Sequence, residues 1–271
     1  MMTGAARRRA ATPADGVAWI TGASSGIGAA LARLLATQGW KVAISARSHD
    51  RLLEIEQQGQ AHVGVIRAFP CDVTDAAAVA ATVREIETAF GPIALGVLNA
   101  GVYLPVDGTD PDLDAFHTSF AVNLGGTANA LVPLIAAMKP RGKGQIAITA
   151  SVAGYRGLPT SAAYGATKAG LINLAEAMRF DLDRLGITLQ VISPGFVDTP
   201  ATKGNPFPMP DLMDVEDAAQ AYAKGLNQPE RFEIAFPASF TWKLKLMRLL
   251  PDFLYFPLVA RTTGWSKRGR S

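Results

Sequence analysis

Cysteine and histidine are scarce in this chain. Its 271 residues include one cysteine, Cys71, and three histidines, His49, His62 and His117. A single thiol cannot form an internal disulfide, and the scattered histidines lack metal-ligand spacing. A disulfide scaffold and a zinc site are therefore excluded, and we expect no metal. The cysteine usage fits a reducing compartment, so we expect a cytoplasmic protein in which Cys71 contributes to packing rather than to chemistry.

Long apolar runs and a secretory signal are also lacking. The longest uncharged stretch, residues 118–138, carries Ser, Asn and Gly, and we interpret it as a core helix rather than a membrane span. The three arginines at 7–9 are not followed by an apolar run, so residues 1–14 are predicted to form a flexible basic tail. No nucleic-acid recognition motif accompanies the basic residues, and we expect no nucleic-acid partner.

The chain does contain a regular alternation of strand-like and helix-like segments. Hydrophobic residues make up 49% of the sequence, which with this length fits one α/β domain, placed at residues 15–240. Predicted strands cover residues 17–21, 41–46, 63–69, 95–99, 145–150, 188–193 and 233–236. Predicted helices include residues 29–38, 76–90, 113–138, 162–185 and 215–225. This alternation predicts a parallel sheet with helices on both faces.

A glycine-rich turn follows the first predicted strand. Gly22, Gly26 and Gly28 lie between an apolar run and a segment of helical composition. Glycines permit a tight turn and close approach of the backbone, and the following helix presents free N–H groups to a diphosphate. The segment therefore predicts a dinucleotide-binding loop, although its spacing is G-x-x-x-G-x-G rather than G-x-G-x-x-G.

A tyrosine and a lysine give the strongest indication of chemistry. Tyr164 and Lys168 are four residues apart, which places them on one face of a helix, and Ser151 precedes Tyr164 by thirteen residues. An ammonium group beside a phenol stabilises the phenolate, so we expect Lys168 to lower the pKa of Tyr164 and to favour proton exchange near neutral pH. The Ser151 hydroxyl is placed to hold a substrate oxygen.

With these motifs in place, the chain resembles the short-chain dehydrogenase/reductase family over residues 15–240. The matching segments follow the family's order: the glycine loop, Asp72-Val73, Asn99-Ala100-Gly101, Asn123, the Ser–Tyr–Lys set, and Pro194-Gly195 with Val197 and Thr199. Leu98 departs from the family's usual asparagine. The resemblance implies a Rossmann-type doubly wound parallel sheet of seven strands in the order 3-2-1-4-5-6-7, in one domain.

The resemblance also implies roles for individual residues. Ser151, Tyr164, Lys168 and Asn123 would be catalytic, with Tyr164 as the general acid or base and Asn123 in a polar network with a water leading to Lys168. Cofactor contacts would come from Gly22, Ser24, Ser25, Gly26, Ile27, Gly28, Arg47, Asp72, Val73, Asn99, Ala100, Gly101, Tyr164, Lys168, Pro194, Gly195, Val197 and Thr199.

The end of the second predicted strand indicates NADP(H) rather than NAD(H). An NAD site places an Asp or Glu there for the ribose hydroxyls, but this chain has no carboxylate before Arg47. A guanidinium at that position can pair with a 2′-phosphate. The alternative is a surface arginine that only covers the adenine.

Substrate residues are expected in and near the loop 200–212, which closes over the substrate in the family. We predict contacts from Ser151, Tyr155, Phe196 and Phe207. The apolar residues of this region are accompanied by no obvious charge clamp. They favour a hydrophobic, lipid-like ketone or secondary alcohol over a small acid or a phosphorylated sugar.

The C-terminal residues 241–271 form a basic, amphipathic extension. They carry seven basic residues and one acidic residue, and Trp242, Leu246, Leu249, Leu250 and Phe253 lie near one face if the segment is helical. Three alternatives remain open: peripheral membrane contact through residues 240–258, packing on the substrate pocket, and a subunit contact. The family is usually dimeric or tetrameric through residues 113–138 and 162–185, so we expect a homodimer or homotetramer.

Two function classes follow from these observations. The first is an NADPH-dependent carbonyl reductase or alcohol dehydrogenase with Tyr164 as general acid or base. The second is a non-catalytic NADP(H)-binding sensor or scaffold. The intact Ser–Tyr–Lys set favours the enzyme.

Overall fold

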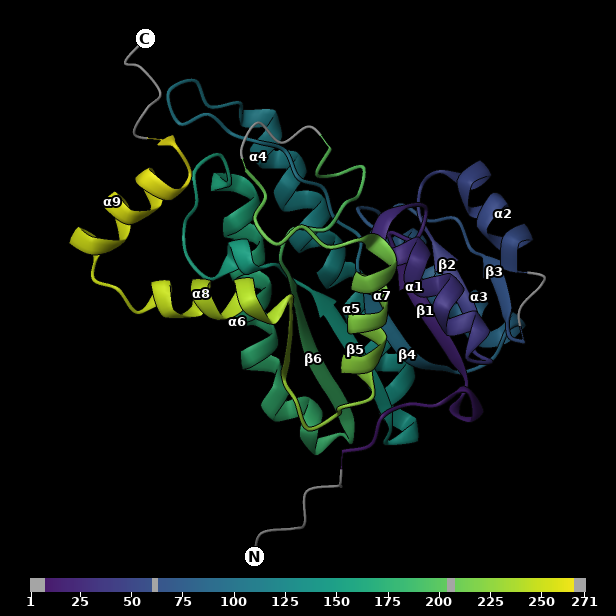
Figure 1. The fold of residues 1–271 in the computed structure, drawn as a ribbon. Helices are drawn as coiled ribbons and strands as arrows, with labels where there is room; N and C mark the ends of the chain where they lie inside the picture. Colours follow the sequence, from purple (N-terminus) through teal and green to yellow (C-terminus); the bar gives the residue numbers. More distant parts are fainter. Residues whose placement is uncertain (1–7, 60–62, 204–207, 266–271) are drawn as a thin grey trace, which may run out of the picture.

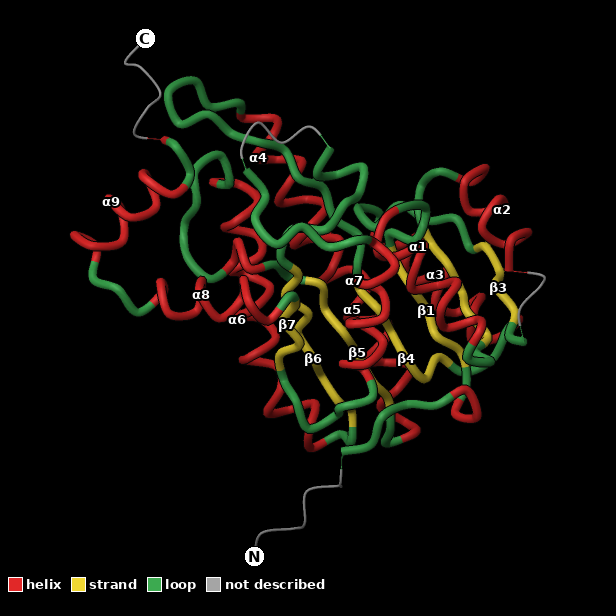
Figure 2. The backbone as a smooth tube through the Cα atoms, in the orientation of Figure 1, coloured by secondary structure: helices red, strands yellow, loops and turns green. Residues whose placement is uncertain are grey.

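A computed structural model describes residues 8–59, 63–203 and 208–265. Within them, seven strands form one parallel sheet in the order β3-β2-β1-β4-β5-β6-β7 (Figure 2). The strands are β1 (Val17–Thr21), β2 (Lys41–Ser45), β3 (Val65–Ala68), β4 (Ile93–Leu98), β5 (Gly144–Thr149), β6 (Ile187–Pro194) and β7 (Glu233–Phe236). The predicted single-domain α/β fold and strand order are confirmed, with strand ends displaced by at most two residues.

Helices cover both faces of this sheet (Figure 1). One face carries α1 (Gly26–Thr37), α2 (His49–Gln58) and α7 (Val215–Leu226). The other carries α3 (Ala76–Ala89), α5 (Gly126–Met138) and α6 (Ala162–Arg184). The described helices also include α4 (Leu113–Ser119), α8 (Ala238–Arg248) and α9 (Asp252–Thr262). In Figure 1, α8 and α9 extend from the main body on the side away from α2.

The first strand shows why the sheet needs both layers. All five residues of β1 are buried. Ala18 and Ile20 belong to the core that includes α1 and α7, whereas Val17 and Trp19 belong to the core that includes α3 and α6. Successive side chains of a strand point to opposite faces, so a continuous apolar run is stable only between two helical layers.

The predicted helix 113–138 is interrupted by a wider turn. After α4, residues Phe120–Gly125 form a π-helix (η3), and α5 then continues the same stretch. By length and composition, Leu113–Arg141 is the one described helical stretch that could cross a membrane. Its residues Leu131, Leu134 and Met138 are buried in the core that includes α3 and α6, so the stretch packs on the sheet.

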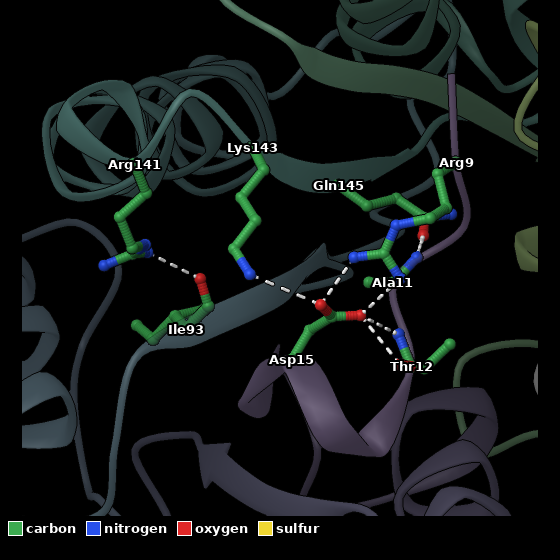
Figure 3. A network of polar contacts seen from close by, with 8 residues as sticks. All are labelled: Arg9, Ala11, Thr12, Asp15, Ile93, Arg141, Lys143 and Gln145. Carbon is green, nitrogen blue, oxygen red and sulfur yellow. Dashed lines mark hydrogen bonds and ion pairs between the residues drawn. The ribbon is translucent and has the colours of Figure 1, made fainter. Parts of the chain in front are cut away.

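The N-terminal segment is held against the amino-terminal edge of the sheet (Figure 3). The Asp15 carboxylate accepts hydrogen bonds from the Arg9 guanidinium and the Thr12 backbone, and Lys143 Nζ lies 3.4 Å from Asp15 Oδ1. The Ala11 N–H donates to Gln145 Oε1 at 2.8 Å. Residues 8–14 are therefore docked, in contrast to the flexible tail expected there. Residues 1–7 of that predicted tail lie outside the described residues.

The C-terminal extension is two helices rather than one amphipathic face. α8 ends at Arg248, Pro251 takes the N-cap position of α9, and that helix runs from Asp252. A proline lacks the N–H that an uninterrupted helix would use at this position, so the chain turns here. The apolar residues that the sequence placed on one stripe are thus divided between two helix axes.

Candidate functional site

A cavity of about 850 Å³ lies beyond the carboxyl ends of the strands. Its walls come from the loops after β1, β2, β3, β4, β5 and β6 and from α6, α8 and α9. This edge of a doubly wound sheet is where ligands bind, because helix N-termini and strand-end loops converge there. The predicted serine, tyrosine and lysine and most predicted cofactor contacts line this one cavity.

The glycine loop after β1 leaves no room for side chains at two of its positions. Gly22 has φ +66, and a Cβ there would lie 2.6 Å from the Ala100 Cα. A Cβ on Gly28 would lie 2.5 Å from the Gly22 carbonyl oxygen and 2.7 Å from Asn99 Nδ2. The turn is therefore packed tightly against the loop after β4. Gly28 makes this packing contact and does not line the cavity, unlike the other predicted glycine-loop residues, Gly22, Ser24, Ser25, Gly26 and Ile27.

The N-terminus of α1 opens into the same cavity. Ser25 is the N-cap residue, and its side chain makes no capping hydrogen bond. The first N–H groups of a helix have no intrahelical partner and carry a partial positive charge, which suits a diphosphate. The tight glycine turn together with this N-terminus fits a dinucleotide.

Two polar residues connect the glycine turn to the loop after β4. The Thr21 hydroxyl accepts hydrogen bonds from the N–H groups of Asn99 and Ala100, at 3.0 and 3.1 Å. Asn99 Nδ2 in turn lies 3.3 Å from the carbonyl oxygens of Thr21 and Gly22. Asn99 thus ties the loop after β4 to the glycine turn, while it and Ala100 and Gly101 line the cavity as predicted.

Arg47 and Asp72 lie on the cavity wall beyond β2 and β3. Arg47 is exposed and follows β2 by two residues. The Asp72 carboxylate accepts hydrogen bonds from the Thr74 N–H and hydroxyl, at 2.9 and 2.8 Å, and the N–H bond lowers the pKa of Asp72 despite partial burial. Val73 also lines the wall. These positions agree with the predicted adenine end of the site.

Ser151, Tyr164 and Lys168 come together from β5 and α6. Ser151 lies two residues after the end of β5, and its Oγ accepts a hydrogen bond from the Ala153 N–H at 3.1 Å. Its hydroxyl acts on the Tyr164 phenol in the direction that lowers the pKa of Tyr164. Lys168 Nζ donates to the Thr149 carbonyl at 2.8 Å and lies 5.4 Å from the centre of the Tyr164 ring. The helical spacing of four residues and the strand end therefore place all three groups in one site.

Burial dominates the electrostatics of this set. It raises the pKa of Tyr164 despite the hydrogen bond with Ser151, and it lowers the pKa of Lys168 to about 8. The sequence predicted a lowered pKa for Tyr164. The predicted direction of the Tyr164 pKa shift is wrong. Loss of solvent destabilises the phenolate more than the nearby groups stabilise it.

Asn123 is in the π-helix and is fully buried. Its Oδ1 accepts from the Val102 N–H at 2.7 Å, and its Nδ2 donates to the Val102 carbonyl and to Thr167 Oγ1, at 3.0 and 3.1 Å. The amide group is thus hydrogen-bonded to the loop after β4 and to α6, and it does not line the cavity. Its visible role is to hold that loop beside Lys168.

The loop after β6 closes the cavity on the nicotinamide side of the predicted site. Pro194, Gly195, Val197 and Thr199 line it as expected. A Cβ on Gly195 would lie 2.9 Å from the Phe240 ring, so α8 packs directly on this loop. The remaining wall is apolar over most of its area.

The predicted substrate residues divide into three outcomes. Ser151 and Phe196 line the cavity. Tyr155 does not: its hydroxyl donates to Glu233 Oε1 at 2.5 Å and its ring packs with Val152 and Phe240, so the prediction for Tyr155 is wrong. Phe207 lies outside the described residues.

The C-terminal helices add cavity residues that sequence reasoning did not assign. These are Phe240, Lys243, Leu244, Met247, Val259, Thr262, Thr263 and Trp265. The only signal was the amphipathic character of the segment, which left pocket packing as one of three alternatives. The spacing of apolar residues along a helix does not predict which distant strand end that helix will cover.

The fold and site together define a dinucleotide-binding α/β protein, and comparisons identify its family. Residues 16–206 match the family described as short chain dehydrogenase. An "uncharacterized oxidoreductase" of Myxococcus xanthus is 33% identical over 238 residues, covering 88% of this chain and 94% of that protein. One of Staphylococcus epidermidis is 34% identical over 218 residues, covering 80% and 94%. The chain belongs to the short-chain dehydrogenase/reductase family of oxidoreductases.

Proposed function

We propose that this protein is an NADP(H)-dependent carbonyl reductase and alcohol dehydrogenase for hydrophobic ketones or secondary alcohols. The observation that carries the proposal is the shared cavity: Ser151, Tyr164 and Lys168 face the same space as the glycine turn and the open N-terminus of α1. A site that only stores a dinucleotide does not need a half-buried phenol and a buried ammonium beside it.

The contacts support the residue roles that we propose. A bound nicotinamide supplies the hydride for reduction or accepts it in the reverse direction. Ser151 holds the substrate oxygen, and Tyr164 gives its phenolic proton to that oxygen as negative charge develops. In alcohol oxidation, Tyr164 takes that proton back.

The pKa directions agree with a proton donor. Because the pKa of Tyr164 is raised, its phenol is protonated at neutral pH and ready to donate. Because the pKa of Lys168 is about 8, most of its ammonium is charged at pH 7 and can stabilise the phenolate left after the transfer. The Thr149 carbonyl holds this ammonium in place.

The preference for NADP(H) is supported by the wall around Arg47. Its exposed guanidinium lines the cavity two residues after β2, where it can pair with a 2′-phosphate through two parallel hydrogen bonds. The wall beyond Ser151 supports an apolar substrate, because it includes Phe196, Leu244 and Met247.

The test is NADPH consumption with ketones of increasing chain length. Wild-type turnover should rise with chain length, and Tyr164→Phe should lower kcat by at least about a hundredfold while NADPH binding persists. Turnover retained by Tyr164→Phe would remove the role assigned to that phenol. NADPH binding without turnover on ketones or alcohols would favour the non-catalytic sensor.

Cofactor preference is tested separately by Arg47→Asp. Loss of the charge-assisted pair should weaken NADPH binding by about tenfold or more, with a smaller effect on NADH. Fluorescence titration of both cofactors measures this directly. Equal affinities of wild type and Arg47→Asp for NADPH would contradict the assignment.

A further inference from the structure

Large apolar side chains are concentrated on the outer surface of α8 and α9. Of the fifteen exposed large hydrophobic residues in the described part of the chain, six lie on these two helices and a seventh, Leu249, lies in the turn between them. We call them the C-terminal apolar face: Trp242, Leu246, Leu249, Phe253, Leu254, Phe256 and Leu258. Leu249 is 79% exposed and Phe253 75%. Single apolar residues are ordinary on a protein surface, whereas a concentration of them in one part of the surface indicates an interaction site.

The helices that carry this face are firmly attached to the sheet. Lys245 Nζ lies 2.5 Å from Glu233 Oε2 on β7. The Arg156 guanidinium donates to the Leu250 carbonyl at the turn between the helices, pairs with Asp252 and lies 3.8 Å from the centre of the Tyr255 ring. Such contacts hold α8 and α9 in one orientation, so the apolar exposure is a property of the folded protein.

The inner sides of the same helices form part of the cavity wall. Leu244 and Met247 of α8 and Val259 of α9 line the cavity, while Leu246, Leu249 and Phe253 face outward. One pair of helices therefore separates the substrate half of the cavity from the apolar face. An apolar ligand held at that face would have a short path to the cavity.

Cations accompany the apolar face. Arg248 and Arg261 are exposed, and no carboxylate of the described residues lies within ion-pair distance of either. The one acidic residue of α8 and α9, Asp252, is paired with Arg156. The charge around the face is thus positive and complements an anionic surface.

We propose that α8 and α9 dock on an anionic lipid bilayer, with the C-terminal apolar face in the headgroup region. Helices with apolar aromatic and aliphatic residues beside Lys and Arg bind in the plane of such an interface. A second copy of the chain fits this face less well. A two-fold contact would place the same face of both copies against each other, so that Arg248 and Arg261 would lie near the same cations of the other copy. Building on the proposed function, this docking lets apolar substrate pass from the bilayer into the cavity.

Vesicle sedimentation tests the docking without any turnover. Wild-type protein should sediment with phosphatidylcholine vesicles that contain phosphatidylglycerol and bind pure phosphatidylcholine more weakly. Leu249→Ser should weaken binding to the anionic vesicles by about tenfold, since it removes an exposed apolar anchor. Arg248→Gln with Arg261→Gln should weaken it by about fivefold per charge at low salt, and by less at high salt.

Matched variants lie on the opposite side of the molecule. Val63 is 87% exposed and precedes β3 by two residues, and β3 lies on the side away from α8 and α9 in Figure 1. Val63→Ser should therefore bind vesicles like wild type. The exposed arginines Arg51 and Arg84 provide the charge control as Arg51→Gln with Arg84→Gln. Thermal unfolding confirms that each variant is folded, and sedimentation velocity gives its oligomeric state.

The outcomes separate the possibilities. Absence of wild-type binding, or equal losses in Leu249→Ser and Val63→Ser, would overturn the docking. A change of oligomeric state in Leu249→Ser with unchanged vesicle binding would assign the face to a second copy. Tyr164→Phe should bind vesicles like wild type. Docking can therefore be tested even if the proposed catalytic function is wrong. Slower turnover of a bilayer-dissolved ketone by Leu249→Ser, with a water-soluble ketone unaffected, would support substrate transfer.

Discussion

At the scale of single residues, Lys168 shows how a site group can oppose stability. Its side chain is 3% exposed, and burial alone brings its pKa from 10.5 to about 8. A shift of this size corresponds to about 3 kcal/mol of unfavourable burial of the charged form at neutral pH. The hydrogen bond to Thr149 recovers part of this free energy.

Lys168→Met is therefore expected to abolish turnover and to raise stability at pH 7 by about 1–2 kcal/mol. The folded pKa is below the unfolded one, so the cost of burying the ammonium is fully present below pH 8. It fades as the pH rises from about 8 to 10.5 and is absent above that range. Urea unfolding at pH 7 and pH 10 should show the advantage of the variant shrinking at the higher pH.

The exposed Lys224 on α7 offers the matched control for this comparison. Lys224→Met removes an ammonium that has no burial cost, so its effect on the free energy of unfolding should be small and should not shrink between pH 7 and pH 10. A Lys168→Met protein that is less stable than wild type at both pH values would show that the ammonium is well solvated.

At the scale of elements, one half-buried carboxylate fastens α8 to the sheet. Glu233 on β7 is approached by Lys245 at 2.5 Å, by the Tyr155 hydroxyl at 2.5 Å and by the Ser193 hydroxyl at 2.7 Å. Burial raises its pKa, but hydrogen bonds from Lys245, Tyr155 and Ser193 together hold the pKa of Glu233 below its usual range. Tyr155 thus positions an element instead of touching substrate.

Lys245→Met should leave Glu233 without its cation and lower stability by about 1–2 kcal/mol, less than for a fully buried pair because Lys245 is partly exposed. Since α8 also lines the cavity, KM for a hydrophobic ketone should rise more than kcat falls. A double-mutant cycle with Glu233→Gln, followed by chemical unfolding and steady-state kinetics, measures the coupling. Additive losses in the cycle would show that the two residues do not act together.

At the scale of the whole molecule, the two edges of the sheet have different tasks. The carboxyl edge carries the cavity, and the amino edge is closed by the N-terminal segment around Asp15 (Figure 3). The Arg9 guanidinium and the Thr12 backbone hold the pKa of Asp15 well below its usual range. Stability and activity can therefore be changed separately.

The predicted homodimer or homotetramer stays a prediction. Exposed Val132 and Phe180 lie on the helices that were assigned to the subunit contact.

Asp15→Asn is expected to lower stability by at most about 1 kcal/mol at pH 7, because the pairs are open to solvent. Its folded pKa is depressed, so the contribution of the carboxylate is present above about pH 4 and is lost as the pH falls further. The unfolding curves of variant and wild type should converge in acid, while kcat and KM at pH 7 stay the same. A loss of turnover in Asp15→Asn would contradict the separation of the two edges.

The sequence alone determined the sheet, the glycine turn and the Tyr164–Lys168 pair. These depend on local periodicity: alternation in strands, glycines where backbones touch, and a spacing of four on a helix. Strand ends in a parallel sheet converge on one edge, so Ser151 and Asn99 could also be assigned to the site before any coordinates.

Only the tertiary structure decided what depends on contacts between distant segments. The direction of the Tyr164 pKa follows from burial by several elements, and the role of Tyr155 follows from Glu233, 78 residues away. Likewise, the contacts of α8 and α9 with β7 and Arg156 determine which side of these helices lines the cavity. The hydrophobic pattern of the helices does not determine it. Local spacing fixes which residues share a face, whereas the packing of the whole chain fixes what that face meets.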